Sequence, residues 1–465
     1  MKPIDKEILR LSLPSILANI TVPVVGMVDI AVAGHLGESG LIGAAAFIGA
    51  VTVGSTLFDL LYWNFGFLRA GTGGLTAQAK GRDDMRGCAD IFIRSVGLAL
   101  ALSLLVWAIQ LPFFKLSFLF IKASPEVYAL AREYFFIRIW AAPATLSLMA
   151  FRGWFIGMQD SVRSMMTDLV VNGVNIAASI ILALGIGRFG GMGFKGVAYG
   201  TLAAQYAGLV YASLALLVRY RVKVFSGIGR DDFAEAFRGS ELRRFLSMNG
   251  DLFVRSLCMM AVYFGFTAIS ARFGDLLLAC GAIMMKLLML FSYFTDGFAY
   301  AGEALTGRFI GEKSISGTRQ AVRHVFLWSL SMVLLFTLAY SFGGVPILRL
   351  MTSDETVVNA SREFLPWLVL MPVIGCPAFT WDGVYLGATA SSSLRDSMIW
   401  AAVAFFAVFL GGIVLLRSLF PSVDYYRSAM HLLMAAYFAH LFARTVVLSL
   451  NYRRDVLGRW FPGES

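Results

Sequence analysis

The sequence predicts an all-α integral membrane protein of about twelve transmembrane helices, arranged as two similar halves. Of its 465 residues, 58% are hydrophobic and only 15% are charged. So few polar residues cannot cover the surface of a soluble globule. The apolar runs are long and unbroken, which favours helices over the short alternating segments of a transmembrane β-barrel.

Each apolar run is long enough to cross a hydrocarbon core of about 30 Å, which takes about 20 helical residues. The runs centre near residues 22, 54, 102, 145, 176, 206, 258, 288, 332, 374, 407 and 437. The first run is predicted to be a spanning helix rather than a cleavable signal. Asp5 and Glu7 interrupt the charged start, and no small-residue cleavage site follows the run.

A sequence repeat divides the chain. The segment Phe65–Gly81 recurs as Asp296–Gly311, and Arg152–Gly157 recurs as Asp382–Gly387. Because both pairs lie about half a chain apart, the halves are predicted to be copies of one unit. We expect a first lobe over residues 1–219, a cytoplasmic linker with an amphipathic segment over 220–244, and a second lobe over 245–465.

The net charge of +10 follows the positive-inside pattern of membrane proteins. If the N-terminus is internal, loops on that side carry about 22 basic residues and the other loops about 9. We therefore expect a multi-pass protein of the cell (inner) membrane with both termini in the cytoplasm. The heaviest basic cluster comprises Arg219, Arg221, Lys223, Arg230, Arg238, Arg243 and Arg244. Without an aromatic platform beside it, membrane lipids rather than nucleic acid are its expected partner.

Asp29, in the first helix, is the leading candidate for a functional residue. A carboxylate in hydrocarbon costs at least about 2.5 kcal/mol and usually faces the bundle interior, where it marks an ion or proton path. A structural hydrogen bond to a neighbouring helix is the alternative. Pro23, six residues earlier, is expected to bend or break the helix because it cannot donate its amide.

Polar residues also occur in the fifth apolar run. It contains Asn172 and Asn175, and Ser179 follows one turn later. Asparagines in an apolar helix either bridge helices or line a hydrated cavity, and the sequence leaves both open.

The second half carries further charges in apolar surroundings. Asp251 and Arg255 have a spacing that allows an ion pair on one helical face, so we expect them to neutralise each other. Lys286 lies near the middle of the eighth helix, where it must find a carboxylate, line water or lose its proton. Asp296 and Glu303 follow on the same helix.

Asp382 lies in the tenth apolar run, after Pro372 and Pro377. Two prolines inside one span predict a broken helix beside a buried acid. Asp382, Lys286, Asp296 and Glu303 are therefore candidate functional residues of the second half.

The cysteines and histidines indicate no metal site and no prosthetic cofactor. No CxxC pair occurs among Cys88, Cys258, Cys280 and Cys376. Three histidines lie near helix ends or among polar neighbours, without metal-ligand companions, and are interpreted as structural: His324, His431 and His440.

Several motifs in register resemble the multidrug and toxic compound extrusion (MATE) family, in particular its DNA-damage-inducible F (DinF)-type branch. In the first half they are Pro23 with Asp29 and Gly34-His35, Tyr62–Arg69 with Gly74–Gln78, and Arg152–Gln159. In the second half they are Asp296–Leu305 and Asp382–Ala388. The similarity runs from about Ile8 to about Arg444, which is nearly the whole chain.

The resemblance implies two six-helix lobes around a central cavity and the export of organic molecules in exchange for protons or sodium ions. It implies that Asp29 is the protonation site, with Asn172 and Asn175 as polar partners. Many relatives have a second carboxylate where this chain has Ser179. A single strong acid favours a proton over a sodium ion, which requires several oxygen ligands. Lys286 stands where we expect a neutral amide in relatives.

Small lipophilic compounds are the expected substrates, and a monomer the expected state. Buried acids favour cationic substrates, although Lys286, Arg152 and Arg255 weaken that inference. A flippase of the same superfamily, moving a lipid-linked or other amphiphilic cargo, is the alternative, and it should show a strongly basic cavity. An enzyme would need a nucleophile beside a base, and a channel would need a charge ring or filter loop; the sequence indicates neither.

Overall fold

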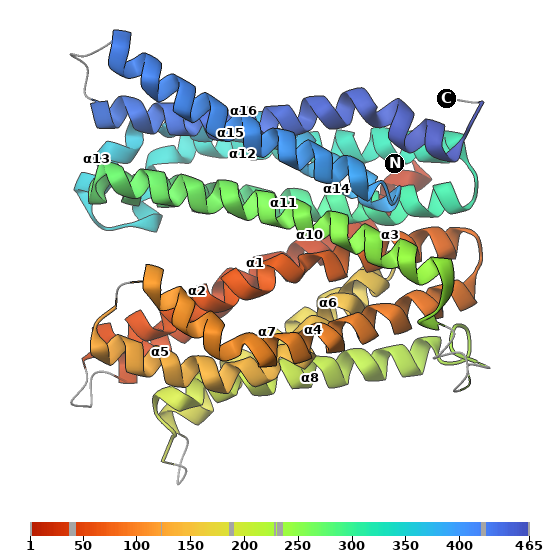
Figure 1. Ribbon diagram of the computed structural model, residues 1–465, viewed down its shortest axis with the longest axis horizontal. Helices are drawn as coiled ribbons and strands as arrows, with labels where there is room; N and C mark the ends of the chain where they lie inside the picture. The colour runs from red at the N-terminus through yellow and green to blue at the C-terminus, as the bar shows by residue number, and fades with distance from the viewer. Residues whose placement is uncertain are drawn as a thin grey trace. The chain divides into compact units, whose positions relative to one another are not determined.

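The computed structural model describes residues 2–36, 43–121, 123–185, 190–226, 229, 236–419 and 425–463. These residues form helices and turns, without a strand among them (Figure 1). Twelve helical segments of this part of the chain are long and apolar enough to span a membrane. Each predicted centre falls inside one of the twelve segments, so the predicted fold class is confirmed.

The first half begins with α1 (Pro3–Leu36), the helix that carries Asp29. Two of its spans contain a 3₁₀ turn, and their parts are α2 (Ala44–Trp63), η1 (Asn64–Gly66) and α3 (Phe67–Gly81), then α5 (Pro125–Arg138), η2 (Ile139–Ala141) and α6 (Ala142–Gly157). The other helices are α4 (Met85–Phe120), α7 (Ser161–Leu184) and α8 (Phe194–Tyr220).

The second half comprises α10 (Gly239–Ser270), η3 (Ala271–Phe273), α11 (Asp275–Gly311), α12 (Ile315–Met351), α13 (Glu355–Arg362), α14 (Leu365–Gly387), α15 (Ser391–Leu419), α16 (Tyr425–Tyr452) and the π-helical turn η4 (Arg453–Gly458). The predicted break in the tenth span is wrong, because α14 stays helical through Pro372 and Pro377. A membrane helix tolerates proline when neighbouring groups satisfy the freed backbone carbonyl.

The chain forms two compact units, one of Leu17–Phe245 and one of Met1–Ile16 with Leu246–Ser465. The first turns of α1 therefore pack with helices of the second half. The Asp5 carboxylate lies 2.7 Å from Nδ1 of His324 and accepts a hydrogen bond from Nε1 of Trp328 at 3.1 Å. The predicted lobes of 1–219 and 245–465 differ from these units in the first residues, and they stay a prediction.

Glycines of the repeated motifs bring helix backbones together in both units. A Cβ atom on Gly153 of α6 would lie 2.1 Å from the Arg69 carbonyl oxygen of α3. A Cβ atom on Gly383 of α14 would lie 2.0 Å from the Ala299 carbonyl oxygen of α11. The next glycine of each motif also meets facing backbone, and these pairs are Gly157 with Gly73 and Gly387 with Glu303. The repeat is thus a repeat of close helix packing.

Four short turns repeat the same backbone conformation. Asp83, Gln159, Lys313 and Thr389 have φ of 59°, 58°, 54° and 52°. They connect α3 to α4, α6 to α7, α11 to α12 and α14 to α15. Asp83 matches Lys313 and Gln159 matches Thr389 in the register of the repeat, so the two halves share their turns as well as their helices.

Aromatic side chains form the core around the packed helices. Trp154 of α6 is fully buried, donates a hydrogen bond from Nε1 to the Cys88 carbonyl oxygen at 2.9 Å, and packs edge-to-face on Tyr220. In the other unit, Tyr340 donates to the Leu287 carbonyl oxygen at 2.8 Å. These contacts hold the spans in a defined register.

The predicted cytoplasmic linker is described only in part. Arg230 and residues 231–235, which form most of the expected amphipathic segment, lie outside the described residues. After them, the chain continues from residue 236 into α10.

Candidate functional site

The α1 helix places Asp29 in the interior of its unit. The Asp29 side chain is 6% exposed, and its Oδ1 atom has no hydrogen-bond partner among the described residues. The helix continues without interruption through Pro23, so the structure shows no break there. A bend at Pro23 stays a prediction.

The α7 helix supplies the polar groups around Asp29. The buried Ser179 hydroxyl lies beside the Asp29 carboxyl group, without a well-formed hydrogen bond between them. Two turns earlier, the Asn172 amide donates to Oγ1 of Thr21 in α1 at 2.5 Å. Asn172 therefore bridges α7 to α1, which is one of the two uses that the sequence left open. The roles of Asn172 and Ser179 in ion coupling stay a prediction.

Asn175 faces α8 rather than α1. Its amide nitrogen donates to Oγ1 of Thr201 at 3.0 Å, while its Oδ1 atom is buried and accepts no hydrogen bond from the described residues. A Cβ atom on Gly200 would lie 2.6 Å from Oγ of Ser179. Glycine at this position lets α8 approach α7 closely and close the site on that side.

Arg138 is a part of this site that the sequence analysis did not assign. It lies at the end of α5 and interacts electrostatically with Asp29 and Asp59. Its Nη1 atom donates to the Tyr134 hydroxyl at 2.8 Å, and its guanidinium lies 4.6 Å from the Phe58 ring centroid. An arginine inside an apolar helix was the available signal, since such residues seek a partner.

The arrangement suits proton uptake. The Asp29 carboxyl group lies beside the neutral hydroxyl group of Ser179, with Arg138 within electrostatic reach. Protonation of Oδ1 would break no hydrogen bond to the described residues. Neither uptake nor release of a proton then requires the surrounding helices to unfold.

In the second half, Asp382 is held by two arginines. It accepts a hydrogen bond from Arg444 at 2.6 Å and pairs with Arg255. The predicted pair of Asp251 with Arg255 is wrong, because Asp251 pairs with Arg395 at 2.6 Å. The Asp382 side chain of α14 reaches Arg255 across helices, and this contact outweighs the local spacing.

The equivalent motif of the first half carries the opposite charge. Arg152 occupies the motif position of Asp382 and pairs with Asp168 of α7 at 2.5 Å. Both halves therefore place an interhelical ion pair beside the close-packed glycine. This repeated position is a structural link between helices, whichever sign its charge has.

The other candidates of the second half do not form one cluster. Glu303 is fully buried in α11, and Asp296 is partly exposed and accepts a hydrogen bond from Ser292 at 3.3 Å. Lys286 is exposed and forms no ion pair or hydrogen bond with the described residues. Within the described part of the chain, no group of three or more His, Cys, Asp or Glu side chains is placed to hold a metal ion.

Comparison with known families identifies the family of this chain. The model of a family described as MatE matches residues 14–181 and 252–416. The chain belongs to the MatE family. This MatE protein is 34% identical to DNA damage-inducible protein F of Escherichia coli over 401 residues, which cover 86% of the chain and 84% of the relative. The predicted family and branch are confirmed.

More distant relatives agree. The MatE protein is 26% identical to a probable multidrug resistance protein NorM of Photorhabdus laumondii over 378 residues, 78% of each chain. It is 24% identical to Protein DETOXIFICATION 45, chloroplastic, of Arabidopsis thaliana over 408 residues, 83% of this chain and 70% of the relative.

Solved structures share the fold. A crystal structure of MATE in the bent conformation matches with a TM-score of 0.81 and 18% identity, over 97% of this chain and 96% of that one. An outward-facing MATE family multidrug resistance transporter matches with a TM-score of 0.80 and the same identity and coverage. At this identity the likeness establishes the fold alone. Family membership and the twelve spans make the chain a multi-pass membrane transporter rather than an enzyme.

Proposed function

We propose that this MatE protein exports small organic compounds in exchange for a cation, and that the cation is a proton rather than sodium. The buried Asp29 carboxyl group, with an unpartnered Oδ1 among the described residues, carries the proposal. Such a group inside a membrane protein is suited to an ion or proton path. The multidrug resistance function in the name of the NorM relative supports organic compounds as the cargo.

In the proposed cycle, Asp29 is ionised while the substrate enters from the cytoplasm. Protonation from the outside neutralises Asp29, bends α1 near Pro23 and releases the substrate. One proton moving through about 150 mV provides roughly 3.5 kcal/mol. That free energy supports a substrate gradient of roughly a few hundred-fold.

The choice of proton over sodium depends on Ser179. A sodium ion requires several oxygen ligands, and a second carboxylate at this position would supply them. Here the Ser179 hydroxyl beside Asp29 is neutral, and Asn175 of the same helix bonds to Thr201 instead. Sodium coupling through the second-half acids Asp296 and Glu303 is the alternative for the coupling ion.

Several further properties belong to the same proposal. The transporter works by alternating access of two lobes, 1–219 and 245–465, joined by the linker 220–244. It is a monomer in the cell inner membrane, with both termini cytoplasmic and membrane lipids as partners. Its substrates are lipophilic, and the acid at Asp29 favours cationic ones.

Transport by the purified protein tests this proposal. The full chain is reconstituted in liposomes, an inward proton gradient is imposed, and ethidium movement and internal pH are followed together. Asp29→Asn is compared with Asp275→Asn, an exposed carboxylate at the start of α11. We expect coupled fluxes in the wild type and in Asp275→Asn, and no proton-driven ethidium transport in Asp29→Asn.

Full proton-driven transport by Asp29→Asn would end the assignment of this residue. Transport that follows a sodium gradient and ignores the proton gradient would overturn the choice of ion. A protein that moves no lipophilic cation under either gradient would favour the flippase alternative with a lipid-linked cargo.

A further inference from the structure

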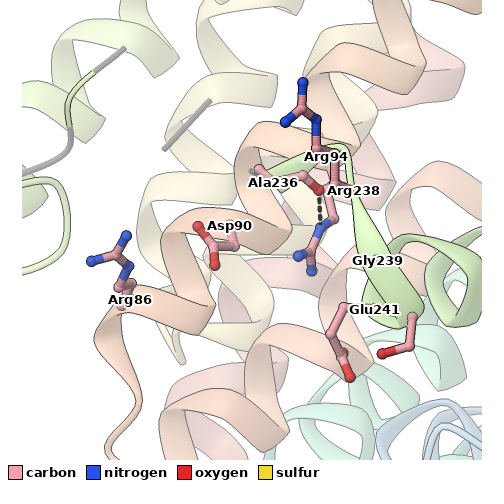
Figure 2. A pocket seen from close by; sticks show the side chains of 8 residues that line it. Arg86, Asp90, Arg94, Ala236, Arg238, Gly239 and Glu241 are labelled. Atoms are coloured by element: carbon pink, nitrogen blue, oxygen red, sulfur yellow. Dashed lines mark hydrogen bonds between the residues drawn. The ribbon is translucent and has the colours of Figure 1, made fainter. Parts of the chain in front are cut away.

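A cavity of about 290 Å³ lies where the start of α4 meets the start of α10. Figure 2 shows its lining, which consists of Arg86, Asp90, Arg94, Ala236, Arg238, Gly239, Ser240 and Glu241. All of these residues belong to the unit Leu17–Phe245. None belongs to the site around Asp29, so the proposed transport mechanism leaves this cavity unexplained.

Arg94 is the central group of the cavity. Its side chain is only 9% exposed, which is unusual for a charged residue. Its Nε atom donates to the Ala236 carbonyl oxygen at 2.6 Å, which fixes the plane of the guanidinium. The remaining N–H groups find no acceptor among the described residues. A buried guanidinium with unused donors and no ion pair to a described carboxylate is suited to bind an anion.

Other donors surround Arg94. Arg86 and Arg238 line the cavity from α4 and from the segment before α10, and both are exposed. Ser240 adds a hydroxyl group in the first turn of α10, whose N-terminus favours negative charge. Asp90 and Glu241 also line the cavity, so its lining contains three arginines and two carboxylates.

The cavity lies at the depth of lipid headgroups. The α4 helix has 36 residues, which corresponds to about 54 Å of helix. A hydrocarbon core is about 30 Å thick, so the ends of α4 must extend into the headgroup layers. Arg86 lies in the first turn of α4, within that extension, and Arg94 lies about two turns later, near its inner limit.

We propose that this cavity binds the phosphate group of an anionic phospholipid, with Arg94 as the main donor and Arg86 and Arg238 as supporting donors. The guanidinium fork matches phosphate oxygens, and the volume is about ten times that of one water molecule in the liquid. A soluble phosphate ester offers the same chemistry, so the experiment must distinguish the two sources.

Lipid binding to the full chain tests the proposal. The protein is reconstituted in phosphatidylcholine nanodiscs with increasing fractions of phosphatidylglycerol, and bound lipid is measured by native mass spectrometry. We expect Arg94→Gln to weaken phosphatidylglycerol binding at least about tenfold, because charge-assisted hydrogen bonds are lost. Arg132→Gln, an exposed arginine of α5 outside the cavity, should bind as the wild type does.

A second variant protects the test against misfolding of Arg94→Gln. Arg86→Gln with Arg238→Gln changes only exposed side chains, and we expect a similar loss of phosphatidylglycerol binding. Equal lipid binding by the wild type and both variants would overturn the proposal. Displacement of the lipid by millimolar inorganic phosphate or glycerol 3-phosphate would show that the cavity binds a soluble phosphate, and it would overturn the assignment to a lipid headgroup. Selective binding that these compounds leave unchanged supports the headgroup assignment.

Discussion

Asp382, Arg255 and Arg444 form an ion triad in the second half. Because of this triad, we expect substitution by asparagine to destabilise the protein at Asp382 but not at Asp29. Asp382 is held by Arg444 and Arg255, whose side chains are 2% and 14% exposed. Removal of one partner from a buried ion pair costs about 3–5 kcal/mol, because the remaining charge stays buried and uncompensated. Asp382→Asn leaves two such arginines, so we expect a loss in the upper part of that range.

Asp29→Asn is the matched comparison. Asp29 is more buried than Asp382, but its Oδ1 atom has no hydrogen-bond partner in the described part of the chain. An amide of the same shape removes the cost of a buried charge, so we expect a free energy of unfolding within about 1 kcal/mol of the wild type, or higher.

Equilibrium unfolding in mixed micelles, titrated with sodium dodecyl sulfate, measures both changes. A triple variant, Arg255→Met with Asp382→Leu and Arg444→Met, should recover most of the loss, since apolar residues of similar volume can replace a buried ion cluster. Wild-type stability of Asp382→Asn would refute the reasoning on the triad. A large loss of stability in Asp29→Asn would show that Asp29 stabilises the fold, against this reasoning.

Three further outcomes follow from the packing. Gly153→Ala should cost about 1–3 kcal/mol by forcing helix backbones apart, whereas Gly173→Ala, with open space at its Cβ position, should be neutral or stabilising in the same unfolding assay. N-ethylmaleimide should label Cys258 first, because the other three free cysteines are buried; mass spectrometry of the native protein showing uniform labelling would contradict the packing. A double-mutant cycle of Asp251→Asn with Arg395→Gln should show a coupling of about 0.5–1 kcal/mol, and a zero coupling would contradict their ion pair.

The close helix contacts explain why the repeat is visible in the sequence. Gly153 and Gly383 each face a carbonyl oxygen that no larger residue could approach. Only glycine fits at such a contact, so the same residue occurs at this position in both halves. The left-handed turns leave no such mark, because four different residues hold that conformation at Asp83, Gln159, Lys313 and Thr389.

The sequence by itself was sufficient for the fold class, the twelve spans, the repeat and the family. Hydrophobic runs are local, and the free energy of placing a segment in hydrocarbon is nearly a sum over its own residues. The same reasoning singled out Asp29, since a lone carboxylate in such a run is costly wherever the helix lies.

Only the tertiary structure decided which polar groups meet. Arg255 was predicted to pair along its own helix with Asp251, yet it pairs with Asp382, more than a hundred residues away. Arg138 approaches Asp29, and Arg94 bonds to the Ala236 carbonyl oxygen, only because distant helices pack side by side. In a low-dielectric interior, partner choice depends on which helices are neighbours, and local spacing carries no information about that.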